Sequence, residues 1–167
     1  SLAAKEVGQI VVRGPSVMSG YWNNPEQTAE TIIDGWVKTG DAGYLDEDGF
    51  LFLVDRVKDM IVSGGENVFS AEVESCLSLL PKVAEVAVIG IPDPQWGEAV
   101  HAIVRLKTGD ESTETELIEH CKAVIAGYKC PRSISFREED FPITGAGKVR
   151  KVDLKKQFWL GQERTIG

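Results

Sequence analysis

The sequence predicts an α+β fold in which helices pack on a small mixed β-sheet, preceded by β-strands in a separate part of the chain. Two apolar runs, at residues 86–91 and 99–106, have the composition of strands. Two helical stripes begin near Ser70 and Thr113. Residues 1–57 are instead rich in Gly, Trp and Asp-Gly turns, which is typical of short strands joined by turns.

The first part of the chain contains one clear helix start among several short strands. Asn24 is a candidate N-cap, Pro25 suits the first helical turn, and Gln27 can return a hydrogen bond to the cap. The acidic segment at residues 46–49 is typical of a turn. The expected strands lie at residues 9–13, 36–38 and 50–54.

The second part begins with a strand and a helix. A strand at residues 60–62 leads into a polar, Gly-containing segment at residues 63–67. Ser70 is expected to cap a helix that stops at Pro81. The apolar positions of that helix are Val73, Cys76, Leu77 and Leu80.

Two strands, a second helix and a short terminal helix follow. The strand at residues 86–91 should close with a turn at residues 92–94, and alternation in residues 99–106 predicts a half-buried strand. Thr113 and Glu116 form a capping box. The stripe behind it is Leu117, Ile118, Cys121, Val124 and Ile125, and the last expected elements are a strand at 134–137 and a helix at 153–159.

The two parts differ in how well they can fold alone. Residues 58–167 are enough for an independent domain. The apolar residues of 1–57 have too few partners nearby, so we expect these strands to come from a larger domain. Unpaired strands of this kind also favour a homodimer of the isolated chain. The chain starts at Ser1 rather than Met, which suggests an excised fragment.

Composition excludes several classes of function. The 167 residues carry 18 Lys and Arg against 26 Asp and Glu, a net charge of −8, which argues against nucleic-acid binding and against a polybasic membrane contact. No apolar run approaches the roughly 18 residues that span a bilayer. The three cysteines have neither disulfide-framework nor zinc-ligand spacing, and buried free thiols suit a reducing compartment. We therefore expect a cytoplasmic protein with no metal site of its own.

Three polar clusters are candidates for chemistry. In residues 38–41 (KTGD), a carboxylate after Gly in a tight turn could accept two hydrogen bonds from a diol, although a turn Asp commonly bonds its own backbone. In residues 55–67, dense charge precedes a Gly pair that lets a ligand approach the backbone, although the segment also suits a solvated connector. In residues 142–151, Lys148 on a Gly-rich loop suits phosphate or carboxylate oxygens, although taken singly a solvated basic loop explains it.

The order and spacing of these clusters resemble the adenylate-forming superfamily of acyl-CoA synthetases, adenylation domains and luciferases. The matching motifs are TGD at 39–41, DRVKDMIVSGGENV at 55–68 and the Pro-x-Thr-Gly-x-Gly-Lys loop ending at Lys148. The likeness runs from Gly8 to about Trp159 and is stronger to the acyl-CoA synthetase branch. It implies that residues 1–57 are the end of the large AMP-binding domain and 58–167 the C-terminal lid domain.

The resemblance also implies an activity and a set of site residues. The complete enzyme would activate a carboxylic acid, fatty or aryl, with ATP as an acyl-adenylate and pass it to CoA, with Mg²⁺ bound by the missing N-terminal domain. The fragment alone would be inactive. By motif match, Lys148 would be the catalytic lysine, Asp41 and Arg56 would bind the nucleotide, and Lys58 would be the hinge. The CoA tunnel would be bordered by Gly64, Gly65, Glu66, Trp96, Tyr128 and Lys129.

Two alternatives stay open. The parent could load a carrier-protein thiol rather than free CoA. The chain could also be a stand-alone module that binds a nucleotide or a partner without catalysis.

Overall fold

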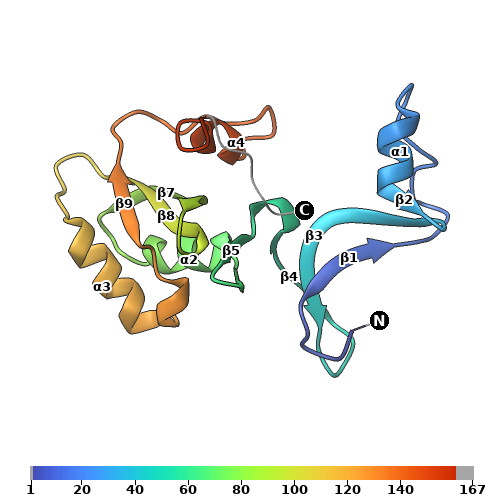
Figure 1. Cartoon of the computed structure of the whole chain (residues 1–167), viewed down its shortest axis with the longest axis horizontal. Helices are drawn as coiled ribbons and strands as arrows, with labels where there is room; N and C mark the ends of the chain where they lie inside the picture. The colour runs from blue at the N-terminus through green and yellow to red at the C-terminus, as the bar shows by residue number, and fades with distance from the viewer. Residues whose placement is uncertain (1, 161–167) are drawn as a thin grey trace. The chain divides into compact units, whose positions relative to one another are not determined.

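The computed structural model describes residues 2–160, and the chain forms two compact units, Ser1–Lys58 and Asp59–Gly167 (Figure 1). The assignment of these parts to a larger domain and a lid stays a prediction. Among residues 2–160, no helix combines the length and apolar character needed to cross a bilayer.

The first unit is an antiparallel sheet with one helix. The order of the sheet is β1-β3-β2, with β4 pairing β3. The long central strand extends well beyond the predicted 36–38, because its backbone pairs with both β1 and β4. The elements are β1 Gly8–Val12, α1 Pro25–Thr31, β2 Ile32–Ile33, β3 Trp36–Leu45 and β4 Leu51–Arg56.

The local signals of the first unit are confirmed. The side chain of Asn24 accepts from Gln27 N–H at 3.1 Å and Pro25 opens α1. Gln27 returns the bond through its side chain, whose Oε1 accepts from Asn24 Nδ2 at 3.1 Å. In the predicted acidic turn, the Asp46 carboxylate accepts from the backbone N–H groups of Asp48 and Phe50. Short-range hydrogen bonds therefore fix both features.

The first unit buries little of its apolar surface. The buried apolar side chains of its described part are Val37 and Ala42. Large apolar side chains along β4 stay exposed, with Leu53 at 69% and Phe52 at 44%. This matches the expectation that the apolar residues of this part lack partners nearby.

The second unit is built around a mixed sheet. β8 pairs antiparallel with β7 along its whole length and, on its other side, antiparallel with β5 and parallel with β9. The predicted α+β class with a small mixed sheet is therefore confirmed. The elements are η1 Val57–Asp59, which begins at the end of the first unit, β5 Ile61–Ser63, β6 Glu66–Val68, α2 Ser70–Ser78, β7 Val83–Asp93, β8 Gly97–Leu106, α3 Glu114–Val124, η2 Gly127–Lys129, β9 Ser133–Phe136 and α4 Lys151–Lys155.

Both faces of this sheet are covered. On one face, α2 and α3 enclose a core that includes Val73, Leu77 and Leu117. On the other, Phe141 and Leu154 pack on the sheet, and Figure 1 shows α4 on the side away from α3. The prediction of a half-buried strand at residues 99–106 is therefore wrong, because the C-terminal segment covers the second face.

Several predicted details also need correction. The N-cap of α2 is Phe69, and Ser70 is the first helical residue, whose hydroxyl accepts a hydrogen bond from Lys151. Val124 is 52% exposed although the stripe placed it inside. β7 continues through Asp93, so the turn comes after it, and α4 begins at Lys151 rather than 153.

The edge strand β7 is bonded by side chains of other elements. Glu74 Oε1 accepts from Val88 N–H at 2.8 Å, and Trp159 Nε1 donates to the Gly90 carbonyl at 3.1 Å. The capping box of Thr113 and Glu116 on α3 is confirmed in both directions. Helix-face thiols are buried as predicted, and burial raises the pKa of Cys121 to about 12, which keeps the thiol protonated.

Candidate functional site

Asp41 and Arg56 lie side by side on neighbouring strands. They are cross-strand partners in β3 and β4, and Arg56 Nε is 2.9 Å from Asp41 Oδ1. The side chains are 35% and 47% exposed respectively, so a ligand can reach both. A carboxylate held beside a guanidinium can accept hydrogen bonds from a vicinal diol. The structure thus brings together the two residues predicted to bind the nucleotide.

A bulge in β3 presents this pair. Gln9 faces Ala42 but Val11 faces Lys38, so two residue steps on β1 oppose four on β3. Extra residues of this kind bend a strand and redirect its side chains. The prediction of a tight turn at residues 38–41 is wrong, because these residues lie within a strand and the bulge supplies the bend.

Thr39 and Gly40 stabilise the bulge. The Thr39 hydroxyl donates to the Ile10 carbonyl at 3.0 Å and accepts from the Asp41 N–H at 3.1 Å, which replaces lost ladder bonds. Gly40 has a φ of +78°, a conformation that side chains rarely adopt. The Thr-Gly-Asp order therefore has a structural reason as well as the chemical one.

Lys58, the predicted hinge, lies in η1 and is the last residue of the first unit. The second compact unit begins at the next residue, Asp59. Its role as a hinge stays a prediction.

Gly64 and Gly65 form the two-residue turn of the β5–β6 hairpin. Their φ values of +62° and +87° suit the mirror-image turn that matches strand twist. Glu66 is paired with Ser63 and begins β6, so both ends of the turn within the polar segment 63–67 belong to strands. Neither residue of the turn carries a side chain of its own.

The Trp96 ring lies against Gly64. A Cβ on Gly64 would come 2.5 Å from Trp96 Cε3, and the Gly64 N–H donates to the Trp96 carbonyl at 2.9 Å. The guanidinium of Arg132 lies 4.5 Å from the centre of the same ring. The structure therefore brings the predicted Gly64 and Trp96 into contact and adds Arg132, which our sequence analysis missed.

The buried carboxylate of Glu98 binds the backbone of the β5–β6 hairpin. Glu98 is 1% exposed and accepts from the Val62 N–H at 3.0 Å. Gly90 lies opposite, where a Cβ would come 2.9 Å from Glu98 Cδ. Sequence analysis gave no sign of this contact, because it depends on the pairing of three strands.

Tyr128 and Lys129 occupy η2, on the segment between α3 and β9. The Lys129 ammonium donates to both carboxylate oxygens of Glu72, at 2.7 and 2.8 Å. This hydrogen bond raises the pKa of Lys129, so the ammonium stays charged. Tyr128 is 48% exposed, and its ring centre is 5.7 Å from the same ammonium.

Lys148 is exposed at the end of a closed hairpin. Ile143 and Val149 form a β-bridge, and Thr144 N–H donates to the Lys148 carbonyl at 2.7 Å. At the base, the Arg150 N–H donates to the Pro142 carbonyl at 2.7 Å. The loop is therefore defined by its own hydrogen bonds, and it presents the Lys148 side chain to solvent.

Lys151 does not belong to a solvated basic loop. Its ammonium is 2.6 Å from Glu74 Oε1 and 2.6 Å from the Ser70 hydroxyl, and its side chain is 13% exposed. Arg150 beside it is 49% exposed. No sequence signal separates these two neighbours, because the partner carboxylate lies on α2, far away in the chain.

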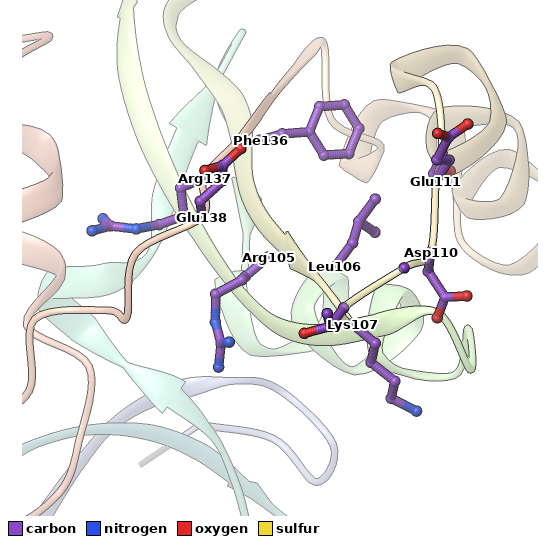
Figure 2. Close-up of a pocket in the computed structure, with 11 residues that line it drawn as sticks. Arg105, Leu106, Lys107, Asp110, Glu111, Phe136, Arg137 and Glu138 are labelled. Atoms are coloured by element: carbon purple, nitrogen blue, oxygen red, sulfur yellow. The ribbon is translucent and has the colours of Figure 1, made fainter.

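A hollow of about 720 Å³ lies at the far ends of β8 and β9. Figure 2 shows Leu106 and Phe136 there, with Arg105 and Arg137 nearby. None of the predicted site residues lines it. The hollow is therefore not the predicted site, and the Arg105 guanidinium beside it is bonded to Glu85.

Comparison with known proteins gives consistent relatives. Residues 72–148 match the family model of the AMP-binding enzyme C-terminal domain. A feruloyl-CoA synthase of an Amycolatopsis species is 48% identical over 92% of this chain and 31% of its own length. The long-chain-fatty-acid–CoA ligase FadD13 of Mycobacterium tuberculosis is 43% identical over 90% of this chain and 30% of its own length. The chain therefore spans about a third of the curated relatives that it matches.

A solved structure has the same fold. The o-succinylbenzoate CoA synthetase MenE of Bacillus subtilis, in complex with its acyl-adenylate intermediate, superimposes with a TM-score of 0.86 at 40% identity. The match covers 92% of this chain and 31% of that one. The chain therefore belongs to the adenylate-forming superfamily and carries the C-terminal domain of its AMP-binding enzymes.

Proposed function

We propose that this chain is the C-terminal part of an AMP-forming acyl-CoA synthetase, an acid–thiol ligase. The observation that carries the proposal is the Asp41–Arg56 pair, an exposed carboxylate and guanidinium held at a strand bulge 2.9 Å apart. The exposed Lys148, which a Gly-rich hairpin of the second unit carries, also supports the proposal. The isolated chain should not adenylate, because the acyl pocket lies outside it.

In the first half-reaction, the substrate carboxylate attacks the α-phosphate of ATP and pyrophosphate leaves. Asp41 accepts hydrogen bonds from the ribose hydroxyls, and Arg56 holds Asp41 and reaches the same sugar. Lys148 places its ammonium against the carboxylate and α-phosphate oxygens, where negative charge develops. The closed hairpin restricts the region that this ammonium can reach.

In the second half-reaction, the CoA thiol attacks the acyl carbonyl and AMP leaves. The side-chain-free turn at Gly64 and Gly65 borders the path of the pantetheine arm, with Trp96 as its wall. Lys129 and Tyr128 line the CoA side. A swing about Lys58 exchanges the Lys148 hairpin for this face.

Magnesium is assigned to the part of the enzyme outside this chain. Bound there, the ion would neutralise the ATP phosphates. The acid is a fatty or aryl carboxylate, a class supported by the names of the relatives.

The first experiment is to sequence the gene upstream of the Ser1 codon. A preceding large domain with a Gly/Ser/Thr-rich phosphate loop supports the ligase. A start codon directly before the Ser1 codon would remove any route to adenylation, and the chain would then be tested as a partner-binding module.

Replacing Lys148 tests the adenylation role in the complete enzyme. Lys148→Ala should slow acyl-adenylate formation about 10²–10³-fold, since one preorganised charge contributes roughly 3–4 kcal/mol at the transition state. Formation of the thioester from preformed adenylate and CoA alone should keep its rate. Equal losses in both half-reactions would contradict the assignment, and failure of CoA alone as acceptor would favour a carrier-protein thiol.

A further inference from the structure

Helix α2 carries two glutamates that hold segments on its two sides. Glu72 binds Lys129 at 2.7 Å, on the segment predicted to face CoA. Glu74 binds Lys151 at 2.6 Å, three residues after Lys148. The two pairs use different partners, so one can be removed without removing the other.

The Lys151–Glu74 pair is more than a surface ion pair. The side chains are 13% and 23% exposed, whereas the Arg150–Asp153 pair next to it involves a 49% exposed guanidinium. Glu74 Oε1 also accepts the Val88 N–H at 2.8 Å, and Lys151 also donates to Ser70 at 2.6 Å. Lys151 is therefore fixed by a carboxylate that is itself bonded to the sheet.

This pair fixes one leg of the Lys148 hairpin. The other leg follows Phe141, which is 5% exposed in the core. The legs meet at the bridge between Ile143 and Val149, two residues before Lys151. With both legs attached, the base of the hairpin has a set position on the unit, and only the turn that carries Lys148 projects.

We propose that Lys151 and Glu74 are positioning residues for adenylation, which orient the Lys148 hairpin through the ion pair. The proposal rests on the proposed function of Lys148. A displacement of about 1 Å at a reacting group can cost roughly 10²-fold in rate. Loss of the pair should therefore slow adenylation and spare thioester formation, in which Lys148 has no part.

The kinetic test uses the complete enzyme and measures each half-reaction separately. Lys151→Met and Glu74→Gln should each slow acyl-adenylate formation about 10- to 100-fold, with thioester formation from preformed adenylate unchanged. Lys151→Arg should retain most of the rate, because a guanidinium also pairs with Glu74. Glu72→Gln is the matched control, which leaves adenylation unchanged.

Hydrogen exchange on this 167-residue chain tests the positioning without catalysis. The amides of Thr144, Gly147 and Arg150 are hydrogen-bonded within the hairpin. They should exchange faster in Lys151→Met and Glu74→Gln than in wild type or Glu72→Gln. Unchanged exchange, or equal slowing of both half-reactions by Lys151→Met, would overturn the inference. If Lys148→Ala left the rate of adenylation unchanged, the proposed function would be wrong. Hydrogen exchange would still show whether the Lys151–Glu74 pair holds the hairpin in place.

Discussion

The Gly64–Trp96 contact shows how one residue can depend on both backbone and space. Gly64 and Gly65 share a left-handed conformation, but only Gly64 faces a ring, since a Cβ on Gly65 would meet nothing within 4 Å. The pair of glycines therefore offers a natural comparison within one turn. The first is needed for its conformation and its lack of volume, the second for its conformation alone.

Alanine substitutions should separate these two effects. Gly65→Ala should lower the free energy of unfolding by about 1 kcal/mol through backbone strain. Gly64→Ala should cost more, because its Cβ would come 2.5 Å from Trp96 Cε3 and the ring must move. Urea unfolding of both variants measures the difference. Equal losses would mean that the ring is free to shift without cost.

In the second unit, local hydrogen bonds determine where helices begin, whereas contacts with distant segments of the chain determine which residues are buried. The capping box of α3 was predictable, because its two residues lie within one turn of the helix. The covered second face of β8 was not, because Phe141 and Leu154 come from a segment that follows three elements later. The hydrophobic period of a strand shows which residues share a face. It does not show whether a distant segment of the chain covers the other face.

Removing the cap of α3 should have a moderate effect. Thr113→Ala removes the hydroxyl that accepts from the Glu116 N–H at 3.2 Å, and should cost about 1 kcal/mol of unfolding free energy. Thr113→Ser keeps the acceptor and should be close to wild type. Chemical denaturation of the pair checks this. A loss with Ser as large as with Ala would place the effect in the methyl group rather than in the cap.

Acid should destabilise the packing of the C-terminal segment on β8. His101 is 4% exposed, bonds Ser133 and Ser135, and its ring centre is 4.9 Å from that of Phe158. Burial lowers the pKa of His101 below its ordinary value of 6.5. The unfolded chain therefore binds the proton more readily, so this contribution to stability is complete above pH 6.5 and is lost as pH falls below it.

Unfolding measured between pH 7.5 and 5 tests this contribution. Wild type should lose stability over this range more steeply than His101→Gln, which cannot take up the proton. Parallel curves for the two proteins would show that the loss comes from other groups.

Across the molecule, the features that are predictable from sequence are those that local motifs determine. The two principal helices and the caps at Asn24 and Thr113 were predicted correctly, because each depends on residues close in the chain. The mixed sheet joins strands far apart in the chain, and the family resemblance rather than local pattern predicted it. Residues 38–41 were placed in a turn because a bulge is visible only when β1 is aligned against β3. Lys151 was missed for the same reason, since Glu74 reaches it from another element.

The side chains bound along β7 have a consequence for self-association. A terminal strand with open N–H and C=O groups is a template on which a second molecule can add a strand. Here Glu74 occupies the N–H of Val88 and Trp159 the carbonyl of Gly90, so neither group is available for such addition. The Glu74 carboxylate, which binds Lys151 at the start of α4, thus also blocks part of this edge against the addition of a strand. A protein that ends before Trp159 would lose the hydrogen bond to the Gly90 carbonyl, and this carbonyl would then be open to a second molecule.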